Sequence, residues 1–277
     1  MTIFGKGLLM ILLLGATIVA QASDTVALRI EPPPSAWHQE LINEMLTLRP
    51  GWRHDDGHPE LSIRFAHGAD NAVDDDRPTL FVVSGRDVIQ RQQSRHGYVV
   101  VRGDLADHIA LIRKLSPLSR KVTVFYDEAS PWSTLPQPDV IDGIALRFHR
   151  VNQEAQLGPS LRQYVDRADA ILLAPGSRLF NLDTAKVVLL TAYRMGLPVF
   201  GPDFAYVAVG SAAAMSVSPR SIAQRVVDQI DHFLDHRQWP DTDVIPADIR
   251  INQHVSGAFN FRYRDSDHIE LFTETLP

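Results

Sequence analysis

The feature that most constrains this chain is a repeated alternation of short apolar runs with helical segments, clearest between residues 170 and 203. The run AILLA at 170–174 is continuous and apolar, as in strands that are buried on both faces. Asn181 or Asp183 then caps a segment with apolar residues at helical spacing, and Gly196 ends it. A second apolar run, 197–200, leads into a Gly-Pro-Asp turn. Strand, helix and strand in this order predict a parallel β-α-β unit.

The same alternation extends over most of the chain. Further strands are expected at 26–30, 61–65, 79–83, 98–101, 121–126, 143–149 and 249–251, and helices are expected after Ser35 and Asp104, at 159–168 and after Ser218. The pattern predicts an α/β fold with two lobes, each built on a doubly wound parallel sheet. We expect residues 23–117 and 244–277 to form the first lobe, completed by the late strand at 249–251. Residues 118–243 are expected to form the second lobe.

The first 22 residues have the pattern of a signal peptide. Lys6 precedes the apolar core at 7–19, and Ala20-Gln21-Ala22 forms a small-residue cleavage site. The core is shorter than the ~20 residues of a membrane-spanning helix, and an uncleaved anchor is the alternative. We therefore expect export to the periplasm and a mature chain that begins Ser-Asp-Thr.

Composition excludes several classes of function. The chain has no cysteine, which excludes disulfides, thiol catalysis and cysteine-ligated metal. Its net charge is −6 and its basic residues are scattered, so we expect no nucleic-acid or DNA partner. The G-x-S-x-G, dinucleotide-loop and P-loop motifs are absent, and we expect neither catalytic residues nor a cofactor. His232 and His236 have a metal-ligand spacing without an evident third ligand, so no metal site is expected.

Candidate ligand contacts follow the expected strands, because ligands of open α/β sheets bind beyond the carboxyl ends of the strands. Arg86 offers bidentate hydrogen bonds to an anion, and an exposed ion pair with Asp87 is its alternative. Trp37 is either a stacking surface or a core residue, and Asp127 either binds an amine or caps a turn. Tyr206 contacts the ligand or is a half-buried helix residue. The complete set of candidates is Ser35, Trp37, Ser84, Gly85, Arg86, Tyr126, Asp127, Pro175, Ser177, Asn181, Phe204 and Tyr206.

The stretch ILLAPGSRLFNLDTAKVVLLTAYRMGLPVFGPDFAYVAVGSAAAMSVSP at 171–219 resembles the ABC-transporter substrate-binding proteins of the tryptophan or aromatic-amino-acid type, in their shorter periplasmic branch. The similar elements include the Pro-containing loop at 174–177, the Phe180-Asn181 pair and the segment 205–212. The resemblance implies a two-lobed type I periplasmic-binding fold with a ligand in the cleft between the lobes. Gly176-Ser177 stands where longer members of that family have an Asp-Asn pair, so the resemblance does not specify the ligand.

These features together favour a soluble periplasmic solute-binding component of an ABC-type uptake system. Its partners would be a small ligand, either anionic or aromatic, and an inner-membrane permease or a membrane sensor. Two other classes stay open: a diverged sensor or interaction protein without a transport role, and a two-lobed periplasmic enzyme. The enzyme would need an acid/base pair across the cleft, for which the sequence offers only Asp127 and Glu128.

Overall fold

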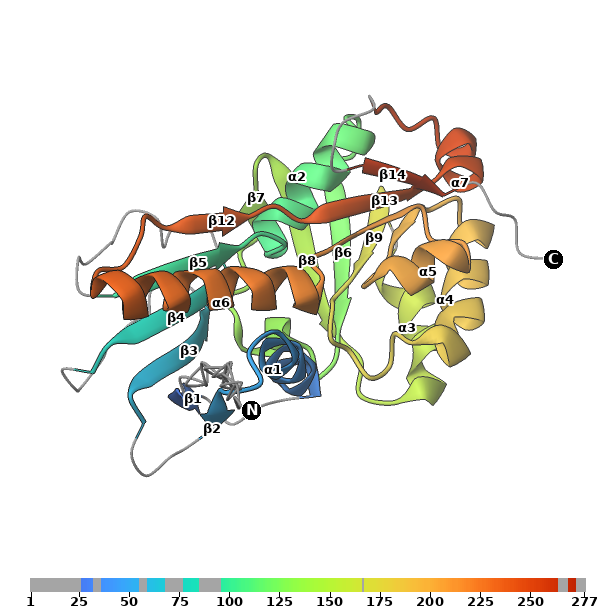
Figure 1. The fold of residues 1–277 in the computed structure, drawn as a ribbon. Helices are drawn as coiled ribbons and strands as arrows, with labels where there is room; N and C mark the ends of the chain where they lie inside the picture. Colours follow the sequence, from blue (N-terminus) through green and yellow to red (C-terminus); the bar gives the residue numbers. More distant parts are fainter. Residues whose placement is uncertain are drawn as a thin grey trace, which may run out of the picture.

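The computed structural model describes residues 26–31, 36–54, 59–67, 77–84, 96–165, 167–263 and 269–272. The expected signal peptide lies outside these residues. Within them, no helix is both long enough and apolar enough to cross a membrane. Two β-sheets with packed helices organise the described chain (Figure 1).

The first sheet contains six strands in the order β12-β5-β4-β3-β1-β2, and every neighbouring pair is parallel. Its strands are β1 (Ala27–Glu31), β2 (Arg53–His54), β3 (Leu61–His67), β4 (Thr79–Ser84), β5 (Gly97–Val101) and β12 (Asp243–Ile245). Helices α1 (Ala36–Leu48) and α6 (Pro219–His236) pack side by side on one face (Figure 1). Alternate strand residues, such as Ile63, Leu80 and Val99, point into this core. The opposite face carries a smaller buried cluster of Phe81, Val83, Tyr98 and Val100, and it holds no helix in the described part of the chain.

The second sheet contains eight strands in the order β14-β13-β11-β10-β9-β6-β8-β7. Its strands are β6 (Lys121–Tyr126), β7 (Val140–Ile141), β8 (Ile144–Arg150), β9 (Ala170–Leu173), β10 (Val199–Phe200), β11 (Ala213–Ser216), β13 (Asp248–Asn252) and β14 (Ile269–Phe272). The pairs β7·β8 and β11·β13 are antiparallel and all the others are parallel. The sheet is therefore mixed at its two sides, where a purely parallel one was expected.

Helices cover both faces of the second sheet. Helix α2 (Leu105–Leu115) packs on one face, where Ile109, Ile112 and Leu115 join the core. Helices α3 (Leu157–Tyr164) and α4 (Leu182–Arg194) pack together on the other face. The shorter elements are η2 (Pro131–Thr134), η3 (Glu154–Gln156), α5 (Phe204–Ala208) and α7 (Gln253–Ala258). The doubly wound arrangement is complete in this lobe.

The expected lobe boundaries were wrong for two helices. Helix α2 belongs to the core of the second lobe, although it was assigned to the first with residues 23–117. Helix α6 belongs to the first lobe, although it was assigned to the second with residues 118–243. The apolar stripe of a helix shows that one side is buried, but it does not show which sheet buries it.

The carboxyl-terminal segment divides between the lobes, which corrects the assignment of 244–277 to the first lobe. Strand β12 pairs with β5 of the first sheet. Strand β13, which contains the expected strand 249–251, pairs with β11 of the second sheet, and β14 follows it there. In Figure 1 the ribbon of β12 and β13 runs on from one sheet into the other.

Candidate functional site

Three short crossovers connect the lobes and set which ends of the sheets face each other. Strand β5 ends at Val101 in the first lobe, and α2 of the second lobe begins at Leu105. Strand β11 ends at Ser216 in the second lobe, and α6 of the first lobe begins at Pro219. Strand β12 ends at Ile245 in the first lobe, and β13 of the second lobe begins at Asp248. Because each crossover starts at the carboxyl end of a parallel strand, the carboxyl ends of both sheets lie toward the partner lobe. This is the edge at which ligands of parallel α/β sheets bind.

The first crossover is held by an ion pair. The Arg102 guanidinium donates to both carboxylate oxygens of Asp107, and Gly103 N donates to Asp107 Oδ2 at 2.8 Å. The hydrogen bond to Asp107 raises the pKa of Arg102 above its usual value. Arg102 N also donates to Ile245 O at 3.0 Å, which ties this crossover to the end of β12. The crossovers that start at β5 and β12 are thus physically joined.

Asp127 organises the loops at the carboxyl edge of the second sheet. Its Oδ2 accepts hydrogen bonds from Ser177 Oγ, Arg178 N and Leu179 N at 2.7–3.0 Å, and its Oδ1 accepts one from Ser130 N at 3.0 Å. Only 4% of the residue is exposed. The structure therefore places Asp127 where it joins two loops, in agreement with the turn-capping alternative.

The loop that contains Pro175 and Ser177 is held by the same network. Ser130 Oγ donates to Pro175 O at 2.9 Å, and Ser177 Oγ accepts from Leu179 N and Phe180 N at 3.1 Å. Between them, Gly176 has φ +69°, and a Cβ at this position would lie 3.0 Å from Pro131 Cδ. The loop therefore needs glycine both for its left-handed backbone and for its close approach to Pro131.

Asn181 caps helix α4, as the sequence predicted. Its side-chain oxygen accepts from Asp183 N and Thr184 N, and its amide donates to Arg178 O at 2.7 Å. The cap uses both ends of the side-chain amide for the fold. Asn181 lies at the carboxyl edge, next to the loop that Asp127 holds, but its hydrogen bonds are directed to its own backbone surroundings.

Exposed polar side chains gather around the carboxyl ends of β6 and β8. Tyr126 is half-buried, and its hydroxyl oxygen accepts from Gln137 Nε2 at 2.8 Å. Arg150 donates to Glu128 Oε2 at 2.9 Å and to Asn152 Oδ1 at 2.8 Å. The phenol, guanidinium, carboxylate and amide thus supply donors and acceptors at an edge that solvent can reach.

Arg150 and Asn152 were missed by the sequence reasoning, although the rule used for the other loops would have found them. Both residues lie at or just after the end of an expected strand, 143–149. The side chain of Arg150 is 44% exposed and that of Glu128 is 86% exposed. Such an exposed pair contributes little to folding stability, so Arg150 can bind another anion at small cost.

His108 of α2 and Trp132 of η2 form a buried aromatic pair in the second lobe. Their rings meet edge to face with centroids 5.0 Å apart, and His108 Nδ1 lies 2.9 Å from Asp104 O. Complete burial lowers the pKa of His108, so the imidazole is neutral near pH 7. Trp132 is 4% exposed and serves as a core residue of the second lobe.

Phe204 and Tyr206 lie in α5, and the structure gives both of them structural contacts. The Arg250 guanidinium lies over the Phe204 ring, 4.6 Å from its centroid. Tyr206 is fully buried in the core of α3 and α4, and burial raises its pKa to about 12, an effect that the nearby Thr184 hydroxyl opposes. A ligand contact through Tyr206 was therefore wrong, since its side chain has no exposed surface.

The candidates from the first lobe lie mostly beyond the described residues. Ser35, Gly85 and Arg86 are outside them, and only the backbone of Trp37 in α1 and of Ser84 at the end of β4 is described. Ser84 ends its strand at the carboxyl edge that faces the second lobe, as expected. The roles of these five residues stay predictions.

The described residues contain no group of three or more His, Asp or Glu side chains that could hold a metal ion. The rings of His232 and His236 stack with centroids 4.3 Å apart, and His236 Nδ1 lies 3.0 Å from His232 O. One ring nitrogen of His236 thus contacts the helix backbone. The stacked pair is explained by helix geometry alone.

Comparison with solved structures gives similar two-lobed proteins. A substrate-binding protein with adhesive properties from Clostridium difficile, in a ligand-free open structure, matches with TM-score 0.55 and 12% identity over 90% of this chain and 99% of that one. An ABC domain from Streptococcus pneumonia in complex with L-Trp matches with TM-score 0.52 and 10% identity over 86% and 94%. An ABC transporter solute-binding protein from Agrobacterium vitis with bound allitol matches with TM-score 0.52 and 13% identity over 85% and 97%. Regulators of the LacI family are also similar in structure.

The chain has the two-lobed type I periplasmic-binding-protein fold. No protein-family model and no curated protein matches the sequence. The identities of 10–13% support the fold alone, and the tryptophan or aromatic branch stays a prediction.

Proposed function

We propose that this protein is an exported solute-binding protein that holds a small ligand between its lobes and presents it to an inner-membrane ABC permease. The observation that carries the proposal is the orientation of the two sheets, whose carboxyl ends face each other across three short crossovers. Similar structures hold L-Trp and allitol, which supports a small molecule as the ligand. The expected signal peptide supports a periplasmic location over the role of a transcriptional regulator.

The ligand would be held by Tyr126, Arg150 and Asn152 of the second lobe together with the loops that contain Ser35 and Arg86 of the first lobe. The exposed guanidinium of Arg150 and the expected one of Arg86 favour a ligand with an anionic group. A ligand that touches both lobes binds the closed form more tightly than the open form, and this difference drives closure.

We further propose that the protein binds its ligand without transforming it. Among the described residues at this edge, the buried carboxylate is that of Asp127, and it accepts four hydrogen bonds from protein groups. A carboxylate in this state is a poor general base, because its lone pairs are already engaged.

The first experiment is native mass spectrometry of the protein purified from the periplasm, to identify small molecules that it retains. Calorimetric titration of that molecule into wild type, Arg150→Ala and Arg86→Ala follows. Each variant should lose about 1.5–3 kcal/mol of binding free energy if its guanidinium holds the anion. Arg86→Lys should lose part of that energy, because the planar fork is gone.

Arg147→Ala is the matched control, since Arg147 is exposed on the same strand, three residues before Arg150 and away from the carboxyl edge. Equal affinity of wild type and both edge variants would remove the anion site. A small-angle scattering profile that saturating ligand leaves unchanged would contradict closure of the lobes.

A further inference from the structure

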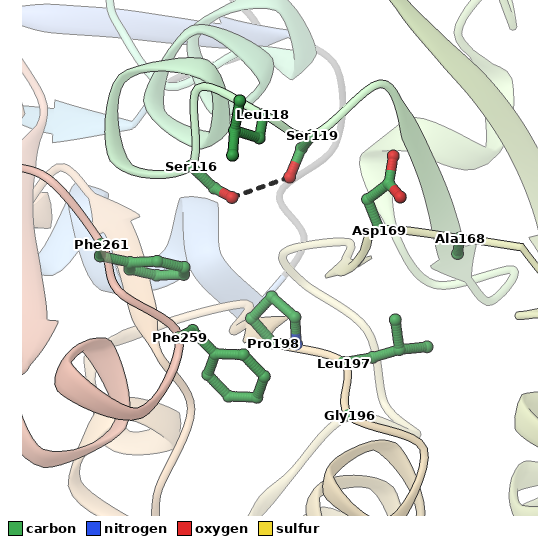
Figure 2. A pocket seen from close by; sticks show the side chains of 10 residues that line it. All are labelled: Ser116, Leu118, Ser119, Ala168, Asp169, Gly196, Leu197, Pro198, Phe259 and Phe261. Carbon is green, nitrogen blue, oxygen red and sulfur yellow. Dashed lines mark hydrogen bonds between the residues drawn. The ribbon is translucent and has the colours of Figure 1, made fainter.

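A pocket of about 310 Å³ lies at the outer end of the second lobe (Figure 2). Ser119, Asp169 and Pro198 line it, and they come just before β6, β9 and β10. These are the amino ends of three neighbouring parallel strands, whereas the proposed ligand site lies at the carboxyl ends. The pocket is therefore separate from the site between the lobes.

The walls of the pocket combine six apolar residues with four polar or glycine residues, and several of them are held by contacts of the fold. Figure 2 shows Phe259, Phe261 and Pro198 on one side, and Leu118 with the hydrogen-bonded pair of Ser116 and Ser119 on the other. Phe261 stacks on Phe200 with centroids 5.6 Å apart. Arg262 N donates to Leu115 O at 2.9 Å, which fixes the aromatic segment to the end of α2. These contacts fix two walls of the pocket relative to each other.

One large apolar side chain at the mouth of the pocket is fully presented to solvent. Leu118 is 85% exposed, the highest value among the exposed large hydrophobic residues of the described chain. Contact of Leu118 with a partner would remove apolar surface from water, and this favours binding of that partner. A single exposed leucine is ordinary on a protein surface, and Leu118 gains its interest here because it borders the pocket.

The surroundings of the pocket are basic, in contrast to the whole chain. Among the described residues of the segments that include its lining, 114–121, 167–169, 194–198 and 259–263, six are exposed and basic and one, Asp169, is acidic. The basic residues are Lys114, Arg120, Lys121, Arg167, Arg194 and Arg262. Asp169 Oδ2 accepts from Arg120 N and Lys121 N at 2.7 and 2.9 Å, so its charge is partly used by the fold. The net charge of the chain is −6, which makes this basic rim a local feature.

We infer that this pocket binds an acidic segment of a partner protein that inserts one bulky apolar side chain. The volume lies at the low end of the range of about 300–1,000 Å³ for small-molecule pockets, which suits a side chain. The basic residues are outside the lining, so an occupant must reach from the pocket to the rim, as a peptide does. Leu118 protrudes as a membrane-binding residue would, but a lipid surface would leave the hollow between Leu118 and Phe259 unfilled, so a peptide is the occupant that uses both features.

The test begins with selection of peptides from a random display library on the full folded protein at low salt. Enriched sequences should combine several acidic residues with one large apolar residue. Their affinity, measured by fluorescence anisotropy, should fall with added salt, because exposed charges are screened. It should also fall about tenfold or more in Leu118→Asp, Lys121→Glu and Arg262→Glu.

Two variants at positions outside the pocket and its basic rim serve as controls. Leu182→Asp changes a leucine that is 54% exposed at the opposite end of α4, and Arg237→Glu reverses an exposed charge after α6 in the first lobe. Both should bind the selected peptides as wild type does.

Three results of the selection would overturn the inference. The library yields no binding peptide, the selected peptides lack acidic residues, or they bind wild type and Leu118→Asp with equal affinity. Vesicles of phosphatidylglycerol that bind wild type but not Leu118→Asp would assign the surface to a membrane and overturn it as well. None of these results bears on the ligand site between the lobes, which is tested by its own titration.

Discussion

Replacing Asp127 by asparagine tests whether this residue is the structural centre of the second lobe's carboxyl edge. The carboxylate accepts four hydrogen bonds, three on Oδ2 and one on Oδ1. An amide can keep the three bonds on its oxygen, but its NH2 group then faces Ser130 N, which is also a donor. Ser130 N would keep its longer bond to the backbone Asp127 O at 3.3 Å, but it would lose the shorter one and face a second donor, which costs about 1–3 kcal/mol.

The remaining three bonds change from charge-assisted to neutral, which weakens each of them, while removal of a buried charge offsets part of this loss. We therefore expect Asp127→Asn to lower the free energy of unfolding by about 2–3 kcal/mol. For a chain of this size the melting temperature should fall by about 5–10 °C. Urea unfolding followed by tryptophan fluorescence is a suitable assay, because buried Trp132 follows Asp127 by five residues.

Glu128→Gln is the matched control for this prediction. Glu128 is the next residue, it is 86% exposed, and its ion pair with Arg150 is at the surface. Its loss should change the unfolding free energy by less than about 0.5 kcal/mol. If Asp127→Asn were as stable as Glu128→Gln, the hydrogen-bond network would not hold the two loops and the reasoning would fail.

Three further predictions concern backbone, proton binding and processing. Gly176→Ala should destabilise the fold by about 1–2 kcal/mol, which is more than the effect of Gly196→Ala. Both glycines have a positive φ, but only at Gly176 would the added methyl lie 3.0 Å from Pro131 Cδ. Equal urea midpoints for the two variants would contradict the role of this contact. Burial lowers the pKa of His108, and it also lowers the pKa of His149, which is less deeply buried. Below the ordinary histidine pKa of 6.5, the unfolded chain therefore binds protons that the native state does not bind. The free energy of unfolding should fall from pH 7 to pH 5 for this reason. In urea titrations at these pH values, His108→Gln should show a smaller decline than wild type. Amino-terminal sequencing of periplasmic protein should read Ser-Asp-Thr, and recovery of full-length chain in the membrane fraction would reject the cleavage site after Ala22.

The sequence predicts many of the strands and helices of this fold, but it predicts less well which lobe each of them joins. The continuous apolar runs at 79–83 and 170–174 are strands β4 and β9, and the caps Asp104, Asn181 and Ser218 all begin helices. Local signals suffice for these because hydrophobic period and capping are local properties. The assignment of α2, α6 and β13 to a lobe depends instead on where the chain passes from one lobe to the other, and no local sequence pattern indicates these positions.

The same limit explains the candidate site. The rule that ligands lie beyond strand ends correctly identified Tyr126 and the loops at 127 and 175–177 as parts of one edge. It did not show that the polar groups of Asp127, Ser177 and Asn181 bond to the fold, since hydrogen-bond partners far apart in sequence are set by packing. Tyr206 was misplaced because a short helix of five residues gives too little pattern to tell its buried side.

The order in which the chain contributes strands to its two lobes has a consequence for folding during synthesis. The first sheet lacks its outer strand β12 until residue 245 is available, and the second lacks β13 and β14 until the last 30 residues follow. Each sheet is therefore incomplete until a segment made late in synthesis is added. For the proposed exported protein, such a delay would favour passage through a membrane channel before the fold is complete. It also means that the loss of one short carboxyl-terminal piece, by a stop codon or a protease, would leave both halves of the molecule unfinished at once.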